Sequence, residues 1–190
     1  MNKLIQIALL GVALSQLHGC AAVVVGGAAT GASVAMDRRT AGAYVGDQEI
    51  ELRAMSRLSE AFKEKPVRIS VTSYNRQALL TGQVPDEATR ARATEIVKGV
   101  PEVRAVLNEL AITDVVSLTT QTNDATTTAN IKTRLLRDER VSANNIKVVT
   151  EAGVAYLMGL VTAAEASAAT EITRNTAGVT KVVTLFEFIN

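Results

Sequence analysis

The sequence contains no tryptophan, one cysteine and one histidine among its 190 residues. The histidine, His18, and the cysteine, Cys20, both precede residue 21, so no later stretch can supply a zinc site of such ligands or a Ser-His-Asp triad. No Gly-x-x-x-x-Gly-Lys-Ser/Thr motif for phosphates is present, and nothing indicates paired carboxylates in a cleft. The 20 basic and 19 acidic residues nearly cancel, unlike the charge of nucleic-acid-binding domains. We therefore expect no enzymatic activity, cofactor, metal or nucleic-acid partner.

The N-terminus has the pattern of a secretory signal peptide. Lys3 is its only charge, and residues 4–14 are apolar apart from Gln6. Small and polar residues then lead to Cys20. A positive start, an apolar core and small residues at a cut site are typical of a signal that is removed from the mature protein. The pattern predicts a signal peptide over residues 1–19, whose removal also removes His18.

The motif Leu17-His18-Gly19-Cys20 resembles the lipobox of bacterial lipoproteins. A lone cysteine in an exported protein cannot form an internal disulfide, and lipidation would explain it. We therefore predict that Cys20 carries the lipid; a plain signal peptide with a chance cysteine is the alternative. In lipoproteins of this kind an aspartate after the cysteine usually means retention at the inner membrane. With Ala21 there, the resemblance implies the outer membrane, with the folded part facing the periplasm.

A stretch rich in alanine, valine and glycine follows, over residues 21–36. These 16 residues are fewer than the roughly 20 that a spanning helix needs. We interpret residues 20–46 as the lipidated cysteine and a tether. Two alternatives stay open: a segment that lies against the membrane, where Gly27 and Gly31 would allow close packing, and an uncleaved anchor over residues 4–36. Arg38 and Arg39 could touch lipid headgroups or lie in a solvated linker.

Beyond residue 46 the chain repeats itself with an offset of 77 residues, which becomes 76 in the last third. The matching stretches keep their order: Arg57-Leu58 with Arg134-Leu135, Ile69-Ser70-Val71 with Ile146-Lys147-Val148, Leu80-Thr81-Gly82-Gln83-Val84 with Leu157-Met158-Gly159-Leu160-Val161, and Ala93-Thr94-Glu95-Ile96 with Ala169-Thr170-Glu171-Ile172. Ordered matches over a whole unit indicate an internal repeat. We predict two domains, residues 47–113 and 124–190, with a linker over residues 114–123.

Each unit has the pattern helix, strand, strand, helix, strand. Asp124 is a suitable N-cap for a helix over residues 124–140, and alternating side chains over residues 67–72 predict a half-buried strand. Turns are expected at residues 74–76 and 151–153, and last strands at 103–112 and 179–189. Thr162 and Glu165 predict a capping box that opens a helix to about Asn175. Gly82 and Gly159 lie within strands, where glycine often marks a bulge or a close backbone approach.

Two helices on one face of a small sheet form a stable layered arrangement. The fold class expected is α+β, with two helices packed on a mixed three-stranded sheet in each of two tandem domains. Tyr74 and Tyr156 are expected to be structural. Phe186 and Phe188 alternate with Leu185 on the last strand, so both faces of that strand would be covered.

The repeated unit resembles the BON domain. The features that carry the resemblance are an apolar strand that leads to Gly and then Val, and a later Gly-Val pair: Leu80-Thr81-Gly82-Gln83-Val84 with Gly99-Val100, and Leu157-Met158-Gly159-Leu160-Val161 with Gly178-Val179. With the lipobox and tether, the whole chain resembles the dual-BON-domain outer-membrane lipoproteins of the DolP type. The resemblance implies a role in cell-envelope integrity, binding of anionic phospholipid through the first helix of the second domain, and action near the β-barrel assembly machinery.

The first helix of the second unit supports a lipid-binding face. At about 100° per residue, Ile131 and Leu135 share one side and should face the core. Leu136 lies on another side, and the residues beside it complete the candidate lipid-binding face: Ala129, Lys132, Thr133, Leu136 and Arg137. An apolar tip flanked by basic side chains suits an anionic membrane surface. The alternative is that Leu136 packs against the first domain and Lys132 is merely solvated.

Two functions remain open from the sequence. The first is a non-enzymatic lipoprotein that maintains the envelope and binds anionic phospholipid. The second is a periplasmic protein-interaction module associated with the β-barrel assembly machinery; binding that survives without lipid would favour it.

Overall fold

The structure, a computed structural model, describes residues 37–190. The predicted signal peptide, Cys20 and the tether as far as Met36 lie outside the described residues. Within the described part of the chain, no helix is long and apolar enough to cross a membrane.

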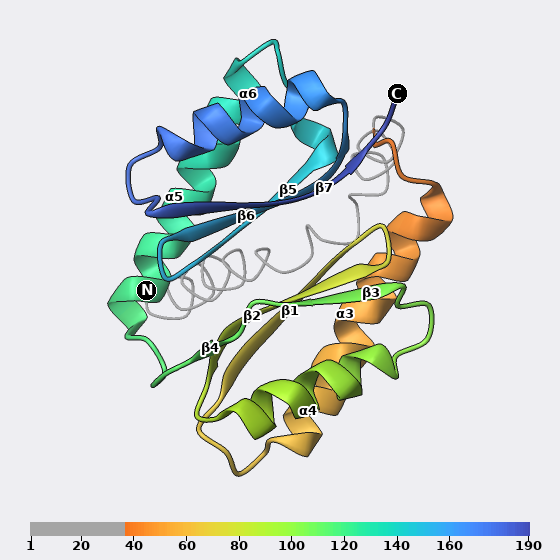
Figure 1. The fold of residues 1–190 in the computed structure, drawn as a ribbon, viewed down its shortest axis with the longest axis vertical. Helices are drawn as coiled ribbons and strands as arrows, with labels where there is room; N and C mark the ends of the chain where they lie inside the picture. Colours follow the sequence, from red (N-terminus) through yellow and green to blue (C-terminus); the bar gives the residue numbers. More distant parts are fainter. Residues whose placement is uncertain (1–36) are drawn as a thin grey trace, which may run out of the picture. The chain divides into compact units, whose positions relative to one another are not determined.

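The first repeat forms one sheet with two helices on the same face (Figure 1). Its elements are α3 (Ala41–Ala61), β1 (Arg68–Tyr74), β2 (Gln77–Val84), α4 (Glu87–Lys98), β3 (Ala105–Asn108) and β4 (Ala111–Ile112). Strands β1 and β2 form an antiparallel hairpin, and β3 and β4 both run parallel to β2. One last strand was predicted over residues 103–112, but Leu110 turns into the core and interrupts it.

The second repeat has the same layers with a continuous last strand. Its elements are α5 (Leu118–Arg137), a short 3-10 helix (Ala143–Asn145), β5 (Ile146–Glu151), β6 (Val154–Val161), α6 (Ala163–Arg174) and β7 (Lys181–Phe188). The sheet order is β5-β6-β7, with β5 antiparallel and β7 parallel to β6. Thr162 and Glu165 form the predicted capping box of α6. The α+β prediction of two tandem units is confirmed.

Two helices begin earlier than the sequence predicted. Helix α3 starts at Ala41, inside the predicted tether, and the Thr40 side chain caps it. Helix α5 starts at Leu118, inside the predicted linker, and the Ser117 hydroxyl accepts a hydrogen bond from a backbone N–H of its first turn. The uncharged, threonine-rich stretch is a weak helix former by propensity, but it buries Thr127 one turn before the apolar core residues. The helix ends at Arg137, not at residue 140.

The prediction that Asp124 caps α5 is wrong, because Asp124 lies inside the helix and binds the hairpin turn instead. Its carboxylate accepts from the backbone N–H groups of Ala152, at 2.8 Å, and Gly153, at 2.9 Å. Asp47 occupies the equivalent place in α3 and accepts from the N–H groups of Asn75, at 2.8 Å, and Arg76, at 2.7 Å. All four turn residues have positive φ. Each aspartate therefore ties the first helix of its repeat to a tight turn.

At Gly82 and Gly159 the backbone of a neighbouring segment comes close, as predicted. A Cβ on Gly82 would lie 2.0 Å from the Arg68 carbonyl oxygen, and one on Gly159 would lie 2.5 Å from the Asn145 carbonyl oxygen. Gly82 also has a φ of +122°, which side-chain-bearing residues rarely adopt. Only glycine lets the two strands of each hairpin meet at this point.

Each repeat has its own apolar core between helices and sheet. In the first repeat α3 contributes Ile50, Ala54 and Leu58, which pack against the sheet and α4. In the second repeat α5 contributes Ile131 and Leu135, as predicted.

A third apolar cluster joins the two repeats. The buried Tyr74 and Leu79 of the first repeat pack with the buried Tyr156 and Met158 of the second. The Tyr74 hydroxyl donates to the Asn145 carbonyl at 3.0 Å, so both tyrosines are structural. Leu185 faces this cluster, whereas its neighbour Phe186 packs on the second core. Strand β7 is therefore covered on both faces, and residues 37–190 form one compact unit.

Arg38 and Arg39 neither lie in a solvated linker nor point to free headgroups. Arg38 donates to both Glu165 carboxylate oxygens, at 2.7 and 3.0 Å, in the second repeat. Arg39 pairs with Asp47 of the first repeat at 2.8 Å, and its guanidinium lies 4.1 Å above the centre of the Tyr74 ring. The Arg39 side chain is only 8% exposed. These two residues, the arginine clasp, bind the start of the described chain to both repeats.

Candidate lipid-binding face

The five residues predicted for lipid binding form a continuous stripe on the outer face of α5. Positions i, i+3, i+4, i+7 and i+8 share one side of a helix, and the stripe follows this spacing: Ala129, Lys132, Thr133, Leu136 and Arg137. All five side chains are exposed, and Leu136 has 67% of its surface accessible. The opposite side of the helix buries Ile131 and Leu135. Leu136 therefore does not pack against the first repeat, which was the alternative.

A shallow hollow of about 230 Å³ lies beside the stripe. Lys132 and Leu136 form its helix side, and the 3-10 helix and the start of β5 form the other, through Ala143, Asn144 and Ile146. The hollow has an apolar floor and one cation at its rim. Such a site can receive an acyl or glycerol portion while the cation meets an anionic headgroup.

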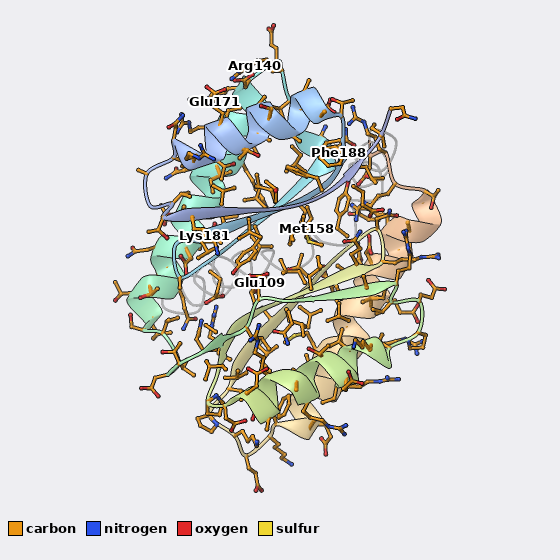
Figure 2. The ribbon with its side chains drawn as sticks, viewed as in Figure 1. Glu109, Arg140, Met158, Glu171, Lys181 and Phe188 are labelled. Carbon is orange, nitrogen blue, oxygen red and sulfur yellow. The ribbon has the colours of Figure 1, made fainter. Side chains whose placement is uncertain are left out.

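The basic groups near the stripe differ in their availability. Arg134 is already committed, because it donates to the Asn175 carbonyl and to the Thr176 hydroxyl. Arg140 pairs with Asp138 at 2.8 Å and with Glu171 at 3.2 Å (Figure 2). The hydrogen bond from Arg140 holds the pKa of Asp138 down to about 2, so the Asp138 carboxylate stays ionised and offsets the charge of Arg140.

Lys132 and Arg137 have no carboxylate partner within residues 37–190. Exposed Glu139 lies just beyond the helix end and reduces the local positive charge. The stripe therefore presents two available cations and one large apolar side chain.

The first repeat carries a related surface that the sequence reasoning missed. Val45, Leu52 and Met55 lie exposed along α3, with accessible fractions of 64%, 74% and 40%. Met55 also lines a hollow of about 350 Å³ at the end of that helix, together with Lys63 and Lys65. The repeat offset of 77 places Met55 opposite Lys132 and Ser59 opposite Leu136, so the alignment of the two repeats could have revealed it.

Comparison with known proteins identifies the family of the two repeats. The model of one protein family, the BON domain, matches the chain twice, over residues 46–114 and 123–190. The chain belongs to the BON family. The two matches correspond to the two repeats, and each match begins within the first helix of its repeat, α3 or α5.

Three relatives extend the comparison. The chain is 35% identical to the outer membrane lipoprotein DolP of Haemophilus influenzae, over 100% of this chain and 99% of that protein. It is 34% identical to the 21 kDa hemolysin of Actinobacillus pleuropneumoniae, over 81% and 80% of the two chains. It is 31% identical to the osmotically-inducible protein Y of Escherichia coli, over 63% and 61%.

The full-length similarity to DolP and the two BON domains together define the class. The chain is an outer-membrane, lipid-anchored protein with two BON domains, of the DolP type, as its resemblance implied. None of these three relatives is named as an enzyme. The stripe on α5 and Cys20 as the lipidated residue stay predictions.

Proposed function

We propose that this lipoprotein maintains the cell envelope without catalysis, by binding anionic phospholipid through α5 of its second BON domain on the periplasmic side of the outer membrane. The observation that carries the proposal is the exposed Leu136 between two cations, Lys132 and Arg137, that have no carboxylate partner within residues 37–190. A side chain of this size gains free energy when it leaves water, and the cations favour anionic headgroups over zwitterionic ones.

The expected affinity is low for the folded unit alone. Each basic side chain near an anionic surface contributes about 1 kcal/mol, and burial of one leucine contributes about 2 kcal/mol. Their sum corresponds to a dissociation constant on the order of millimolar. A covalent anchor raises the local concentration of membrane to that range or above. The stripe therefore orients and selects lipid, while the anchor holds the protein at the membrane.

The test is co-sedimentation of residues 37–190 with vesicles of anionic or of zwitterionic phospholipid. The fragment should begin at Asp37, because a later start would remove the arginine clasp. We expect binding to anionic vesicles that weakens with added salt, since screening reduces the attraction. Leu136→Glu should lower the bound fraction at least tenfold, because it removes the apolar contact and adds a negative charge.

Ser59→Glu is the matched control, since Ser59 occupies the equivalent exposed position on α3 of the first BON domain. Its binding should equal that of the unsubstituted fragment. Equal losses in both variants would show a general charge effect and contradict the proposed site. Absence of binding to either vesicle would reject lipid recognition by the folded unit and favour the protein-interaction function, with the assembly machinery as the partner to test.

A further inference from the structure

Strand β7 is a long free edge of the second sheet. All eight of its residues pair with β6, and no strand within residues 37–190 pairs with its other side. The corresponding edge of the first BON domain is interrupted, since β3 and β4 are separated by Glu109 and the buried Leu110. Interruption of an edge strand blocks pairing with other chains. The second domain lacks this protection, although its edge strand is rich in valine and phenylalanine.

The sequence of β7 is complementary to itself in the antiparallel direction. If two copies pair with Thr184 opposite Thr184, each residue after Thr184 lies opposite the residue at the same distance before Thr184 in the other copy. The opposed pairs are then Lys181 with Glu187, Val182 with Phe186, Val183 with Leu185, and Thr184 with itself. Opposite charges, apolar pairs and threonine pairs are the combinations that stabilise antiparallel neighbours.

The charges at the two ends of the strand are placed for this contact. Lys181 is exposed and has no carboxylate partner within residues 37–190. Glu187 is 26% exposed, accepts a hydrogen bond from the Asn75 side-chain amide at 2.9 Å and lies 3.7 Å from Arg104, so Lys181 of the second copy would join these two contacts. Figure 2 shows Lys181 and Phe188 at opposite ends of β7. A parallel pairing would instead place equal charges side by side.

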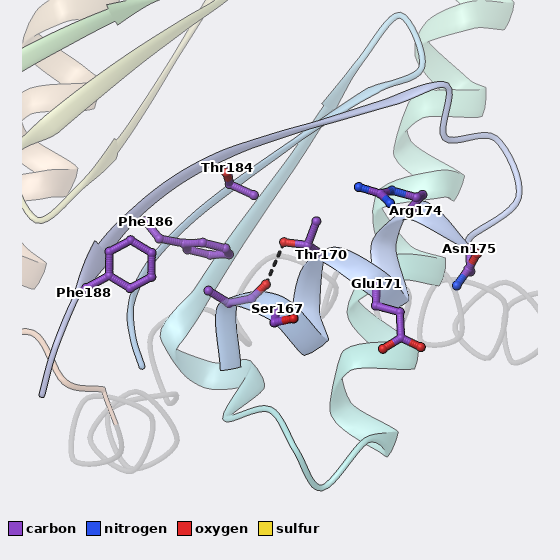
Figure 3. Close-up of a pocket in the computed structure, with 9 residues that line it drawn as sticks. Ser167, Thr170, Glu171, Arg174, Asn175, Thr184, Phe186 and Phe188 are labelled. Carbon is purple, nitrogen blue, oxygen red and sulfur yellow. Dashed lines mark hydrogen bonds between the residues drawn. The ribbon is translucent and has the colours of Figure 1, made fainter. Parts of the chain in front are cut away.

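A groove of about 520 Å³ lies beside this edge, between β7 and α6 (Figure 3). Thr184, Phe186 and Phe188 form its strand side. The helix side combines small residues of α6, Ala166 and Ser167 among them, with the charged Glu171 and Arg174. Phe188 is 69% exposed. In the antiparallel pair, Val182 of the second copy lies opposite Phe186 and on the same face, so it fills the part of the groove nearest the edge.

We propose that two copies of this chain associate through antiparallel pairing of their β7 strands about a twofold axis at Thr184. The two three-stranded sheets of the second BON domains then become one continuous sheet of six strands. Such a contact stops at a dimer, because each copy contributes the same edge strand and no free β7 edge is left for a third copy. It also removes the exposed edge and brings two lipid anchors into one particle.

The first test is disulfide cross-linking of the full-length chain in membranes. Cys20 is the only native cysteine, so Thr184→Cys adds a single new thiol. Directly opposed residues have Cβ atoms about 5 Å apart, close to the distance that a disulfide bridges. We expect a reducible dimer on mild oxidation.

Lys181→Cys is the matched control on the same strand. Lys181 lies three residues from the axis, so its two copies are six residues, or about 20 Å, apart along the paired strands and should not cross-link. Cross-linking of Lys181→Cys that equals that of Thr184→Cys would overturn the proposed register.

The second test is sedimentation equilibrium of residues 37–190, which hold both cores and all strands described above. The unsubstituted unit should show a concentration-dependent mass that approaches twice that of the monomer. Thr184→Lys opposes two lysines at the axis and should give a monomer with an unchanged circular dichroism spectrum. Leu136→Glu, which lies on α5, should still dimerise. A monomeric mass for the unsubstituted unit at every concentration, without cross-linking at Thr184, would overturn the proposal.

Discussion

Two adjacent arginines, Arg38 and Arg39, illustrate how single residues organise this molecule. A planar guanidinium can bind both oxygens of a carboxylate and can also stack on an aromatic ring. Arg38 uses the first property on Glu165, and Arg39 uses the second on Tyr74. The two side chains bind different BON domains. Because the two residues are adjacent, their Cα atoms are only three backbone bonds apart, which couples one ion pair to the other. The start of the described chain is thus fixed to both domains.

The ion pair of Arg38 and Glu165 should make stability depend on pH. Arg38 lowers the pKa of Glu165 to about 2, below the ordinary value of a glutamate. The contribution is therefore complete above pH 5 and is lost as the pH falls toward 2. Glu165→Gln removes the charge but keeps a side chain that suits a capping box. At pH 7 we expect a loss of about 2 kcal/mol in the free energy of unfolding, measured by urea denaturation.

The decisive comparison is between pH 7 and pH 3. The stability difference between the parent unit and Glu165→Gln should shrink at pH 3, because the glutamate of the unfolded parent is then protonated while that of the folded parent still holds its charge. Arg53→Ala serves as control, since Arg53 pairs with Glu49 on the surface of α3, with both side chains more than half exposed. Its effect should stay below about 0.5 kcal/mol. A difference for Glu165→Gln that does not change with pH would show that the ion pair adds nothing.

At the scale of elements, each BON domain depends on the contact between its first helix and its hairpin turn. The turn residues adopt positive φ, which costs free energy for residues other than glycine. Hydrogen bonds that the turn N–H groups donate to an aspartate carboxylate offset this cost, and such charge-assisted bonds are strong. Asp47 and Asp124 lie 77 residues apart and make the same contact. The repeat therefore conserves an interaction as well as a pattern of elements.

Asp124→Ala should destabilise the unit by about 1–3 kcal/mol, because it leaves two turn N–H groups without their acceptor. Asp124→Asn keeps one acceptor oxygen and should recover part of the loss. Glu139→Ala is the control, as Glu139 is an exposed acid beyond the end of the same helix. Urea denaturation followed by circular dichroism measures all three. If Asp124→Ala and Glu139→Ala were equally stable, the turn would not need the carboxylate.

Local patterns predicted the elements better than their ends. The strand predicted over residues 67–72 forms β1, and Thr162 and Glu165 form the predicted capping box, because each signal lies within a few residues. The early start of α5 was missed, since Ser117 and the threonines after it have no apolar period. The partners of Arg38 were also out of reach, because Glu165 lies 127 residues further along the chain.

The candidate lipid-binding face was predictable for a similar reason. Helical spacing alone places Leu136 away from Leu135, and the structure exposes the first and buries the second. The hollow beside Leu136 was not predictable, because the chain after Arg137 leaves the helix and returns through Ala143 and Ile146. Its shape depends on tertiary contacts and not on the period of one helix.

At the scale of the whole molecule, the two BON domains form one compact unit, residues 37–190. An apolar cluster, the Tyr74 hydroxyl and the arginine clasp join them. A further ion pair, Arg68 with Glu151, bridges the domains at 2.6 Å. Rotation of one domain against the other would break these contacts together. We therefore expect the position of the tether to set which surface of the folded unit meets the membrane.

Cys20→Ala in the full-length chain should separate the contribution of the anchor from that of the folded unit. Acyl chains contribute about 0.8 kcal/mol for each buried CH₂ group, which far exceeds the few kcal/mol expected from Leu136, Lys132 and Arg137 together. We expect most of the variant to leave the membrane fraction after cell fractionation. A residual bound portion should disappear when Leu136→Glu is added, if α5 makes the remaining contact.

Tight membrane association of Cys20→Ala has three possible origins. An uncleaved anchor over residues 4–36 would show as a larger mass of the retained protein, and the same experiment can separate the other two. If removal of residues 21–36 from Cys20→Ala releases the protein, that segment itself holds the membrane, as in the alternative of a membrane-associated tether. If the protein stays bound without the segment and is released only by Leu136→Glu, the folded unit binds far more tightly than its two cations and one leucine account for. That result would require further contacts, and the exposed Val45, Leu52 and Met55 of α3 are the first to substitute.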